Sequence, residues 1–294
     1  MPGTILDGRK LSSEIRQELT ERIKALEPQG VVPTLAGFLV GDDPGSASYV
    51  RLKEKACNEV GLRAEMQHLP ADCSQEQLLR KLRDLVQRTD VHGVFVQLPL
   101  PAQIDEELVL AEVAPEKDVD GFHPQSVGRA WLGQESFVPA TPAGIMEMLR
   151  RTGHDNLWRK HAVIVNTDSL VGKPMAALLT RDDVGANVTL CNPDTQGIAD
   201  LTRQADLLVV SVNRAAFITA DMVKEGVIAI DFGSNYVDDL SAKQGYRLVG
   251  DIDFEAVQQK AAAITPVPGG AGPMTVTMLL AHTVLAAERS ASRA

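Results

Sequence analysis

The chain has 294 residues, of which 44% are hydrophobic, and a formal net charge of −10 at pH 7. This length suffices for two ordinary domains, and the acidic charge argues against nucleic acid as a partner. No run of about 18 apolar residues is present, so we expect no membrane span. The first residues lack the basic and apolar regions of a secretory signal peptide.

The cysteine pattern excludes two further classes of protein. Cys57, Cys73 and Cys191 form no CxxC pair, so we expect neither a zinc site nor a disulfide framework, and a reducing cytoplasm fits best. No cluster of metal-ligating residues stands out, and we predict no metal cofactor.

The first half of the chain alternates helical and strand-like segments. The predicted helices cover residues 11–26, 46–61 and 75–88, and the predicted strands cover residues 34–40 and 94–96. Ser46 is the expected N-cap of the second helix, and Gly61 is its expected stop. The prolines that follow the second strand end its ladder and force an extended exit.

The second half has the rhythm of βαβ units. Its predicted strands cover residues 162–165, 187–191, 207–212, 227–231 and 263–265, and its predicted helices cover residues 172–179, 198–203 and 220–225. This alternation predicts a parallel, doubly wound sheet. We therefore predict an α/β protein with a first α/β domain at residues 1–139 and a Rossmann-like domain at 140–274. The apolar helix predicted at 275–294 is expected to pack back on the first domain.

Tyr49 and Lys53 are the first candidates for a functional site. They are four residues apart, so they share one face of the predicted helix, and Ala56 and Val60 continue that stripe. A lysine on an apolar stripe either extends its amine to water or sits desolvated with a function. Spacing alone favours the first interpretation.

Three other segments each allow a functional and a structural interpretation. Gln97 ends a buried strand, where open α/β sheets place ligand groups, but a polar residue there can also mark the end of burial. The segment 117–124, KDVDGFHP, concentrates charge around Asp120, which also suits a solvated turn. The segment 268–275, PGGAGPMT, follows a strand and opens a helix, and its glycines either admit a ligand or build a rigid turn.

Together these segments closely resemble the FolD family, the bifunctional methylenetetrahydrofolate dehydrogenase/methenyltetrahydrofolate cyclohydrolases. The resemblance rests on YVRLKEKA at 49–56, VQLPLP at 96–101, KDVDGFHP and PGGAGPMT, in that order. It implies that Lys53 is the catalytic lysine, Tyr49 stacks on the folate, Gln97 orients the lysine and Asp120 holds the pterin ring. It also implies a homodimer and a folate cleft lined by Pro268, Gly269, Gly270 and Pro273. Residues 1–139 would then be the catalytic domain.

The residue types suit this chemistry independently. A cyclohydrolase adds water to a cationic N–C–N carbon and breaks one C–N bond, which needs a group that moves protons near neutral pH. A lysine whose pKa is lowered by desolvation can do so, and the amide of Gln97 can bond the amine without holding it charged. The carboxylate of Asp120 accepts from a donor-rich ring edge, and Tyr49 offers a flat apolar surface.

The cofactor-facing segments depart from the family pattern. Where the family has Gly-Arg-Ser, this chain has Asn166, Thr167 and Asp168, although Val171, Gly172 and Pro174 of the helix start remain. The neutral Thr167 cannot replace a bidentate arginine on the NADP 2′-phosphate, and Asp168 would repel that phosphate, while a carboxylate can still contact the ribose diol of NAD.

Two later segments are altered as well. The family's Gly-x-Pro loop reads SVNRAAF at 211–217, without glycine, and the segment 191–195 reads CNPDT. A degenerate dinucleotide site is therefore predicted, and its residues would be Asn166, Thr167, Asp168, Ser169, Gly172 and Asn213.

These observations predict a folate one-carbon enzyme with cyclohydrolase activity and weak or absent NADP-dependent dehydrogenase activity. Alternatives are the ordinary bifunctional enzyme, with NADP or NAD, and an enzyme that passes the carbon of methylenetetrahydrofolate to another acceptor. A non-catalytic folate-binding partner of a complete paralogue is a fourth hypothesis, but such a protein would not need Lys53.

Overall fold

The computed structural model describes residues 2–239, 241–242 and 245–293. The chain divides into two compact units, each made of two pieces of sequence. The six-stranded unit comprises Met1–Ser12 and Thr141–Thr275, and the three-stranded unit comprises Ser13–Ala140 and Val276–Ala294. The division of function between residues 1–139 and 140–274 stays a prediction.

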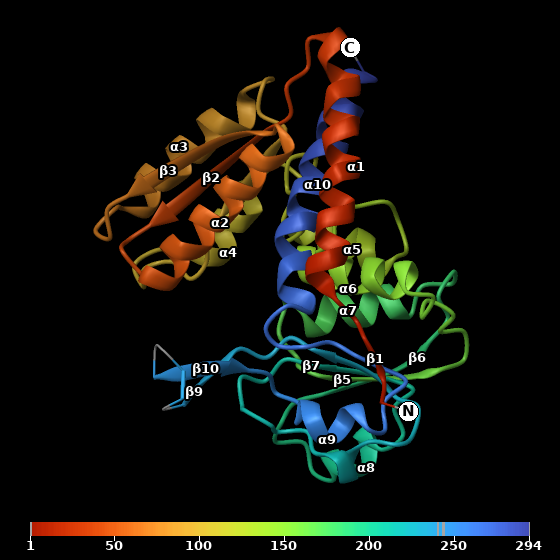
Figure 1. Ribbon diagram of the computed structural model, residues 1–294. Coiled ribbons are helices and arrows are strands. Elements are labelled where there is room, and N and C mark those ends of the chain that lie inside the picture. Colours follow the sequence, from red (N-terminus) through yellow and green to blue (C-terminus); the bar gives the residue numbers. More distant parts are fainter. Residues whose placement is uncertain (1, 240, 243–244, 294) are drawn as a thin grey trace. The chain divides into compact units, whose positions relative to one another are not determined.

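The three-stranded unit is a parallel sheet with helices (Figure 1). Its strands are β2 (Thr34–Val40), β3 (Arg63–Leu69) and β4 (Gly93–Val96), in the order β3-β2-β4. Its helices are α2 (Pro44–Val60), α3 (Gln75–Gln87), α4 (Glu106–Glu112) and α5 (Pro124–Trp131), and the 3-10 turn η1 covers Glu27–Gln29. Every residue of β2 is buried, which explains its unbroken apolar sequence, because the central strand of a parallel sheet is covered on both faces.

Local sequence signals fix the helix that carries Lys53. Asp43 is the N-cap of α2, and its side chain accepts a hydrogen bond of 2.7 Å from the backbone N–H of Ser46. The prediction of Ser46 as the N-cap is therefore wrong, since this residue lies inside the first turn. Pro44 suits the helix start because its missing N–H is not needed there. Gly61 ends the helix with φ +84°, as predicted.

Helices α1 (Gly8–Leu26) and α10 (Ala271–Ala291) lie side by side in the three-stranded unit along much of their length (Figure 1). Arg16 Nε donates to Thr277 Oγ1 at 3.1 Å, and Arg22 forms an ion pair of 2.6 Å with Glu288. Helix α10 also packs on β4, because a Cβ on Gly93 would lie only 2.8 Å from Thr283 Oγ1.

The six-stranded unit contains the parallel sheet predicted for the second half. Its strands are β1 (Thr4–Ile5), β5 (His161–Val165), β6 (Asn187–Cys191), β7 (Leu207–Val210), β8 (Ile228–Asp231) and β11 (Ala263–Ile264), in the order β1-β11-β8-β7-β5-β6. The helices are α6 (Ala140–Arg151), α7 (Gly172–Leu179), α8 (Ile198–Thr202) and α9 (Phe254–Gln258). The chain leaves β5 for β6 on one side and then crosses to β7 on the other, so the topological switch point lies between β5 and β7.

Several predicted elements differ from the structure. The helix predicted at 220–225 is only a 3-10 turn, η2 (Ala220–Met222), because Val223 is extended. The two-residue strand β1, the charged strand β3 and the antiparallel hairpin of β9 (Asn235–Asp238) and β10 (Tyr246–Val249) were not predicted. Among the described helices, none combines the length and apolarity that a membrane span needs.

Candidate active site

Lys53 is buried on α2, with only 6% of its surface exposed. Its Nζ lies 3.8 Å from the centroid of the Phe95 ring and 5.6 Å from the centroid of the Tyr49 ring. Burial lowers the pKa of Lys53, and the nearby carboxylate of Asp120 partly opposes this. The structure thus supports the desolvated alternative for this lysine, and an amine of lowered pKa can exchange a proton near neutral pH.

Phe95 is the residue that sequence reasoning missed. It lies on β4 two positions before Gln97, so the two side chains leave the same face of the strand, and this spacing could have revealed it. The ring occupies space that Gly37 of β2 leaves open, since a Cβ on Gly37 would lie 2.3 Å from Phe95 Cε1. Glycine at 37 therefore permits the aromatic surface beneath the lysine.

Asp120 lies in a loop that its neighbour Asp118 holds together. The buried carboxylate of Asp118 accepts hydrogen bonds of 2.9–3.1 Å from the backbone N–H groups of Gly121, Phe122 and His123. Burial raises the pKa of Asp120, and Lys53 counteracts that rise. The two acidic residues of KDVDGFHP thus differ in role, because Asp118 builds the turn and Asp120 interacts with the lysine.

Gln97 follows β4, at the carboxyl end predicted for a ligand group. Its Nε2 donates to the carbonyl of Leu98 at 2.9 Å, and its Oε1 is buried without a hydrogen-bond partner among the described residues. A buried, unpaired acceptor normally has an explanation, and a donor on a bound substrate or the amine of Lys53 would satisfy it. The predicted orientation of Lys53 by Gln97 stays a prediction.

The segment predicted to line the folate cleft belongs to the six-stranded unit. Arg9 donates its backbone N–H to the carbonyl of Gly269 at 3.2 Å, and a Cβ on Gly8 would lie 1.8 Å from the carbonyl oxygen of Gly270. The close approach therefore requires glycine at position 8, and it packs this segment against the start of α1. The roles of Pro268, Gly269, Gly270 and Pro273 in substrate binding stay predictions.

The first βα turn of the six-stranded unit is closed by its own side chains. Asn166 Oδ1 accepts from the backbone N–H groups of Asp168 and Gly172, both at 2.9 Å. Asp168 Oδ1 accepts from the N–H groups of Leu170 and Val171 at 2.9 and 2.7 Å. Gly172 is required by close approach, because its Cβ would lie 2.0 Å from the carbonyl oxygen of Asn166.

This turn lies at the switch point of the sheet. Asn166 follows β5 and donates through Nδ2 to the carbonyl of Ser211, which follows β7, at 2.8 Å. Open α/β sheets bind ligands in the crevice at such a point, so the topology fits a dinucleotide. Thr167, Asp168 and Ser169 are exposed there, as is Asn213.

The altered loop after β7 is held by hydrogen bonds from its backbone to a buried carboxylate. The fully buried carboxylate of Asp251 accepts from the backbone N–H groups of Val212, Asn213 and Arg214 at 2.5–3.0 Å. Arg214 in turn forms an ion pair of 3.1 Å with Asp194 of the altered segment 191–195. The three unusual segments are therefore bonded to one another.

Two family models cover most of the chain. Residues 6–120 match the catalytic domain of tetrahydrofolate dehydrogenase/cyclohydrolase, and residues 139–291 match the NAD(P)-binding domain of the same family. The chain belongs to the FolD family. The α/β fold and the resemblance noted in the sequence are thereby confirmed.

Curated relatives and solved structures are similar to this chain over nearly its whole length. The bifunctional FolD protein of Chloroherpeton thalassium is 50% identical over 285 residues, covering 95% of this chain and 97% of that protein. That of Salinibacter ruber is 51% identical over 290 residues, covering 99% and 97%. The Campylobacter jejuni FolD structure gives a TM-score of 0.92 at 44% identity, with 97% of this chain and 99% of that chain covered. The Trypanosoma brucei FolD structure, complexed with NADP and an inhibitor, gives 0.93 at 37% identity, with both chains fully covered.

Proposed function

We propose that this chain is a bifunctional methylenetetrahydrofolate dehydrogenase/methenyltetrahydrofolate cyclohydrolase. The observation that carries the proposal is the buried Lys53, held over Phe95 and beside Asp120, in a chain about 50% identical to bifunctional FolD proteins. These relatives favour the bifunctional alternative over the expectation that dehydrogenase activity is weak or lost. The substrate is a tetrahydrofolate carrying a one-carbon unit between two nitrogens.

The cyclohydrolase half-reaction follows from the lysine. Water adds to the methenyl carbon and loses a proton, one C–N bond then breaks, and the departing nitrogen takes up a proton. We propose that the amine of Lys53 accepts the first proton and delivers it again, because burial brings its pKa down toward the working pH. Asp120 would accept from the amino edge of the ring, and Tyr49 would cover the ring face.

The dehydrogenase half-reaction needs a nicotinamide dinucleotide, which accepts a hydride from the methylene carbon when bound. The exposed residues Thr167, Ser169 and Asn213, around the switch point between β5 and β7, would border it.

One observation favours a second candidate, a cyclohydrolase with little NADP-dependent activity. Asp168 places an exposed carboxylate at the turn before α7 and already accepts two backbone N–H groups there. A 2′-phosphate at this turn would meet a like charge, whereas NAD lacks that phosphate. Paired titrations of NADP and NAD decide the question, beside assays of methylene oxidation and methenyl hydrolysis. Micromolar NADP binding with normal oxidation would exclude the second candidate.

The experiment that tests the site compares Lys53→Met with Lys55→Met. Lys55 lies on the same helix but is 75% exposed in its side chain, where it pairs with Glu59 at 3.9 Å. We expect methenyl hydrolysis to fall by at least ~10²-fold in the first variant and to persist in the second. Near-normal turnover in Lys53→Met would show that another residue moves the proton.

We also propose that the enzyme is a homodimer. The hairpin of β9 and β10 carries Tyr236 and Tyr246, which are 71% and 40% exposed and meet edge to face at 5.1 Å between ring centroids. Exposed aromatic rings of this kind are typical of interfaces. Sedimentation equilibrium would show a single monomeric mass if the proposal is wrong.

A further inference from the structure

The three-stranded unit contains a pocket lined by residues around the start of β4, helix α5 and the end of α10. Its volume is about 670 Å³, which is within the range of small-molecule sites. We call it the distal pocket. The residues that matter for its chemistry are His92, Lys117, Arg129, Phe137, Arg289 and Arg293.

The distal pocket is far from Lys53 along the sheet. His92 immediately precedes β4 and Gln97 immediately follows it, so the two lie at opposite ends of the strand. Five residues of extended chain span about 16 Å. The pocket is therefore separate from the proposed folate site.

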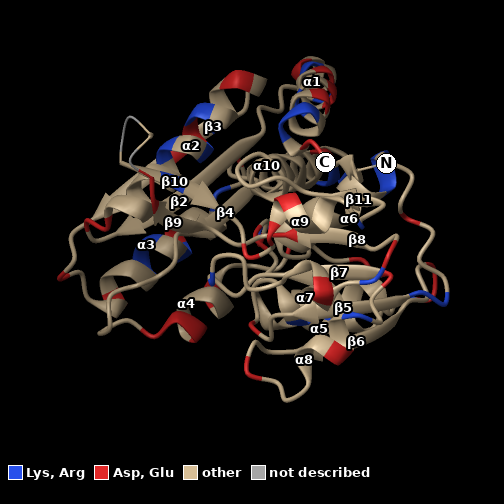
Figure 2. Cartoon of the chain, turned by 60° about the horizontal axis from the view of Figure 1, so that its bottom comes forward, with Lys and Arg blue, Asp and Glu red and all other residues tan. Residues whose placement is uncertain are grey.

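Its charge is opposite to that of the whole protein. The chain carries a net charge of −10, and acidic residues are spread over elements of both units (Figure 2). The distal pocket, in contrast, is lined by four cations and only two carboxylates, Glu116 and Glu135. A ligand that selects this pocket is expected to be an anion.

Two of the four cations are already engaged. Arg289 forms an ion pair with Glu135 and lies 5.0 Å from the Phe137 ring centroid. Lys117 donates through Nζ to the backbone carbonyls of Val86, at 2.7 Å, and Arg88. These contacts fix the walls of the pocket.

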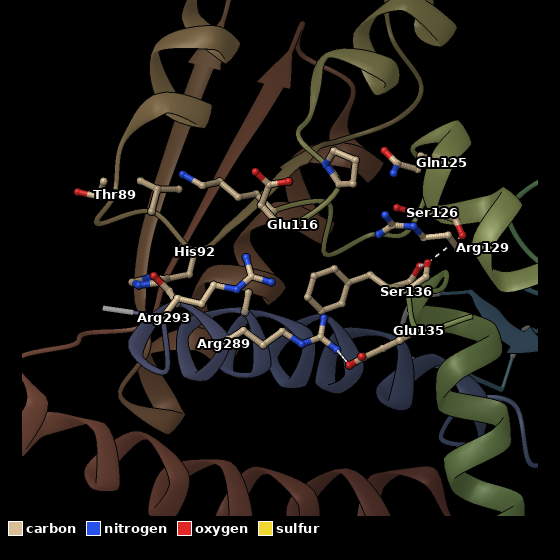
Figure 3. Close-up of a pocket in the computed structure, with 16 residues that line it drawn as sticks. Thr89, His92, Glu116, Gln125, Ser126, Arg129, Glu135, Ser136, Arg289 and Arg293 are labelled. Carbon is tan, nitrogen blue, oxygen red and sulfur yellow. Dashed lines mark hydrogen bonds and ion pairs between the residues drawn. The ribbon is translucent and has the colours of Figure 1, made fainter. Parts of the chain in front are cut away.

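The other two cations have no such neutralising partner. Within residues 2–239, 241–242 and 245–293, neither Arg129 nor Arg293 makes an ion pair with a carboxylate. Both guanidinium groups point toward the middle of the pocket, that of Arg129 from α5 and that of Arg293 from the turn after α10 (Figure 3). Guanidinium groups are forked donors that suit multi-oxygen anions.

His92 adds a neutral donor whose tautomer is fixed. Its Nδ1 accepts the backbone N–H of Thr34 at 3.2 Å, so the ring proton resides on Nε2. Burial and the nearby Lys117 lower the pKa of His92, which favours the neutral ring. The residue is only 7% exposed and is one of the residues that line the pocket (Figure 3).

We propose that the distal pocket binds the phosphate group of a small phosphate ester. A phosphate presents three terminal oxygens and up to two negative charges, which suits the two unpaired guanidinium groups of Arg129 and Arg293, whereas a carboxylate presents two oxygens and one charge. A free phosphate would fill only a small part of the volume, so the remainder of the pocket accommodates the esterified group. This site is additional to the folate and dinucleotide sites.

Isothermal titration at low salt tests the proposal with three probes: ribose 5-phosphate, inorganic phosphate and succinate. We expect the order of affinity to follow this sequence. Arg129→Gln should weaken the two phosphate probes by about 10–100-fold, as expected for the loss of a charge-assisted contact. Arg80→Gln is the matched control, because Arg80 is an exposed arginine of α3 outside the pocket.

The variant also separates this site from the dinucleotide turn, which can hold phosphate too. Binding heat that remains in Arg129→Gln comes from the dinucleotide turn, and binding heat that is lost in this variant comes from the distal pocket. Because Arg129 is exposed, the variant should fold, and an unchanged thermal melt and unchanged methenyl hydrolysis would verify this. Identical phosphate binding in both variants, absence of binding by both phosphate probes, or succinate binding as tightly as phosphate would each overturn the proposal.

Discussion

Replacing Phe95 with leucine should change how Lys53 titrates without exposing it. The Nζ lies 3.8 Å from the ring centroid in a buried setting, where a cation–π contact is worth about 2 kcal/mol. The ring favours the charged amine, so its removal lowers the pKa of Lys53. At 1.36 kcal/mol per pKa unit, the expected drop is about 1 to 1.5 units. Leucine is chosen because it keeps the amine covered by apolar atoms.

The assay is the pH dependence of kcat/KM for methenyl hydrolysis, which reports groups of the free enzyme. The flank of the pH profile of kcat/KM that reports the titration of Lys53 should move to lower pH by about one unit. This holds whether the charged or the neutral amine is the active form. Phe38→Leu is the matched control, because Phe38 is a fully buried ring of β2 in the same sheet and makes no ring contact with Lys53. The reasoning would be refuted if this flank of the pH profile did not shift in Phe95→Leu, or if it shifted equally in Phe95→Leu and Phe38→Leu.

Four further predictions concern other positions. Lys53→Met should lose hydrolysis by at least ~10²-fold while Lys55→Met retains it, as measured by methenyl turnover. Asp168→Ser should tighten NADP by about tenfold or more relative to NAD, because it removes a repelling charge; equal effects on both nucleotides in calorimetry would contradict this. Ala216→Gly should raise the free energy of unfolding in urea by up to ~1 kcal/mol, since Ala216 has φ +51° and left-handed backbone disfavours a side chain. Burial raises the pKa of Asp231 to about 6, so its contribution to stability is full below about pH 4 and is lost as the pH rises through 6; the stability deficit of Asp231→Asn should therefore shrink by up to ~3 kcal/mol between pH 4 and 7.

The periodicity of apolar residues in the sequence predicted those helices and strands that bury either one face or their whole surface. The apolar runs of β2 and β5 and the amphipathic α3 are visible in the sequence because each buries a defined face. Strand β3, RAEMQHL, escaped because a mostly half-exposed edge strand does not need apolar side chains. Strand β1 escaped because two residues carry no period, and its partner β11 lies at the other end of the sequence.

The candidate site was partly predictable for a related reason. Tyr49 and Lys53 are coupled by helical spacing, so local sequence is enough to place them together. Phe95 and Gly37 are coupled only through the register of β2 with β4, which the sequence does not display. The split of roles between Asp118 and Asp120 depends on which carboxylate faces the backbone of its own loop, and charge pattern alone cannot distinguish them.

The interleaving of the two units has a consequence for synthesis on the ribosome. Thr4 of β1 pairs with Ala263 of β11, so the first strand to emerge has no partner until almost the whole chain has been made. The three-stranded unit waits still longer, because Thr283 and Glu288 of α10 complete its contacts with β4 and α1. Neither unit can therefore complete its fold while the rest of the chain is still being synthesised, as an N-terminal domain ordinarily does. Ribosome-stalled chains that end near residue 140 should therefore remain protease-sensitive, and a gene cut at that point should yield two incomplete fragments rather than two autonomous domains.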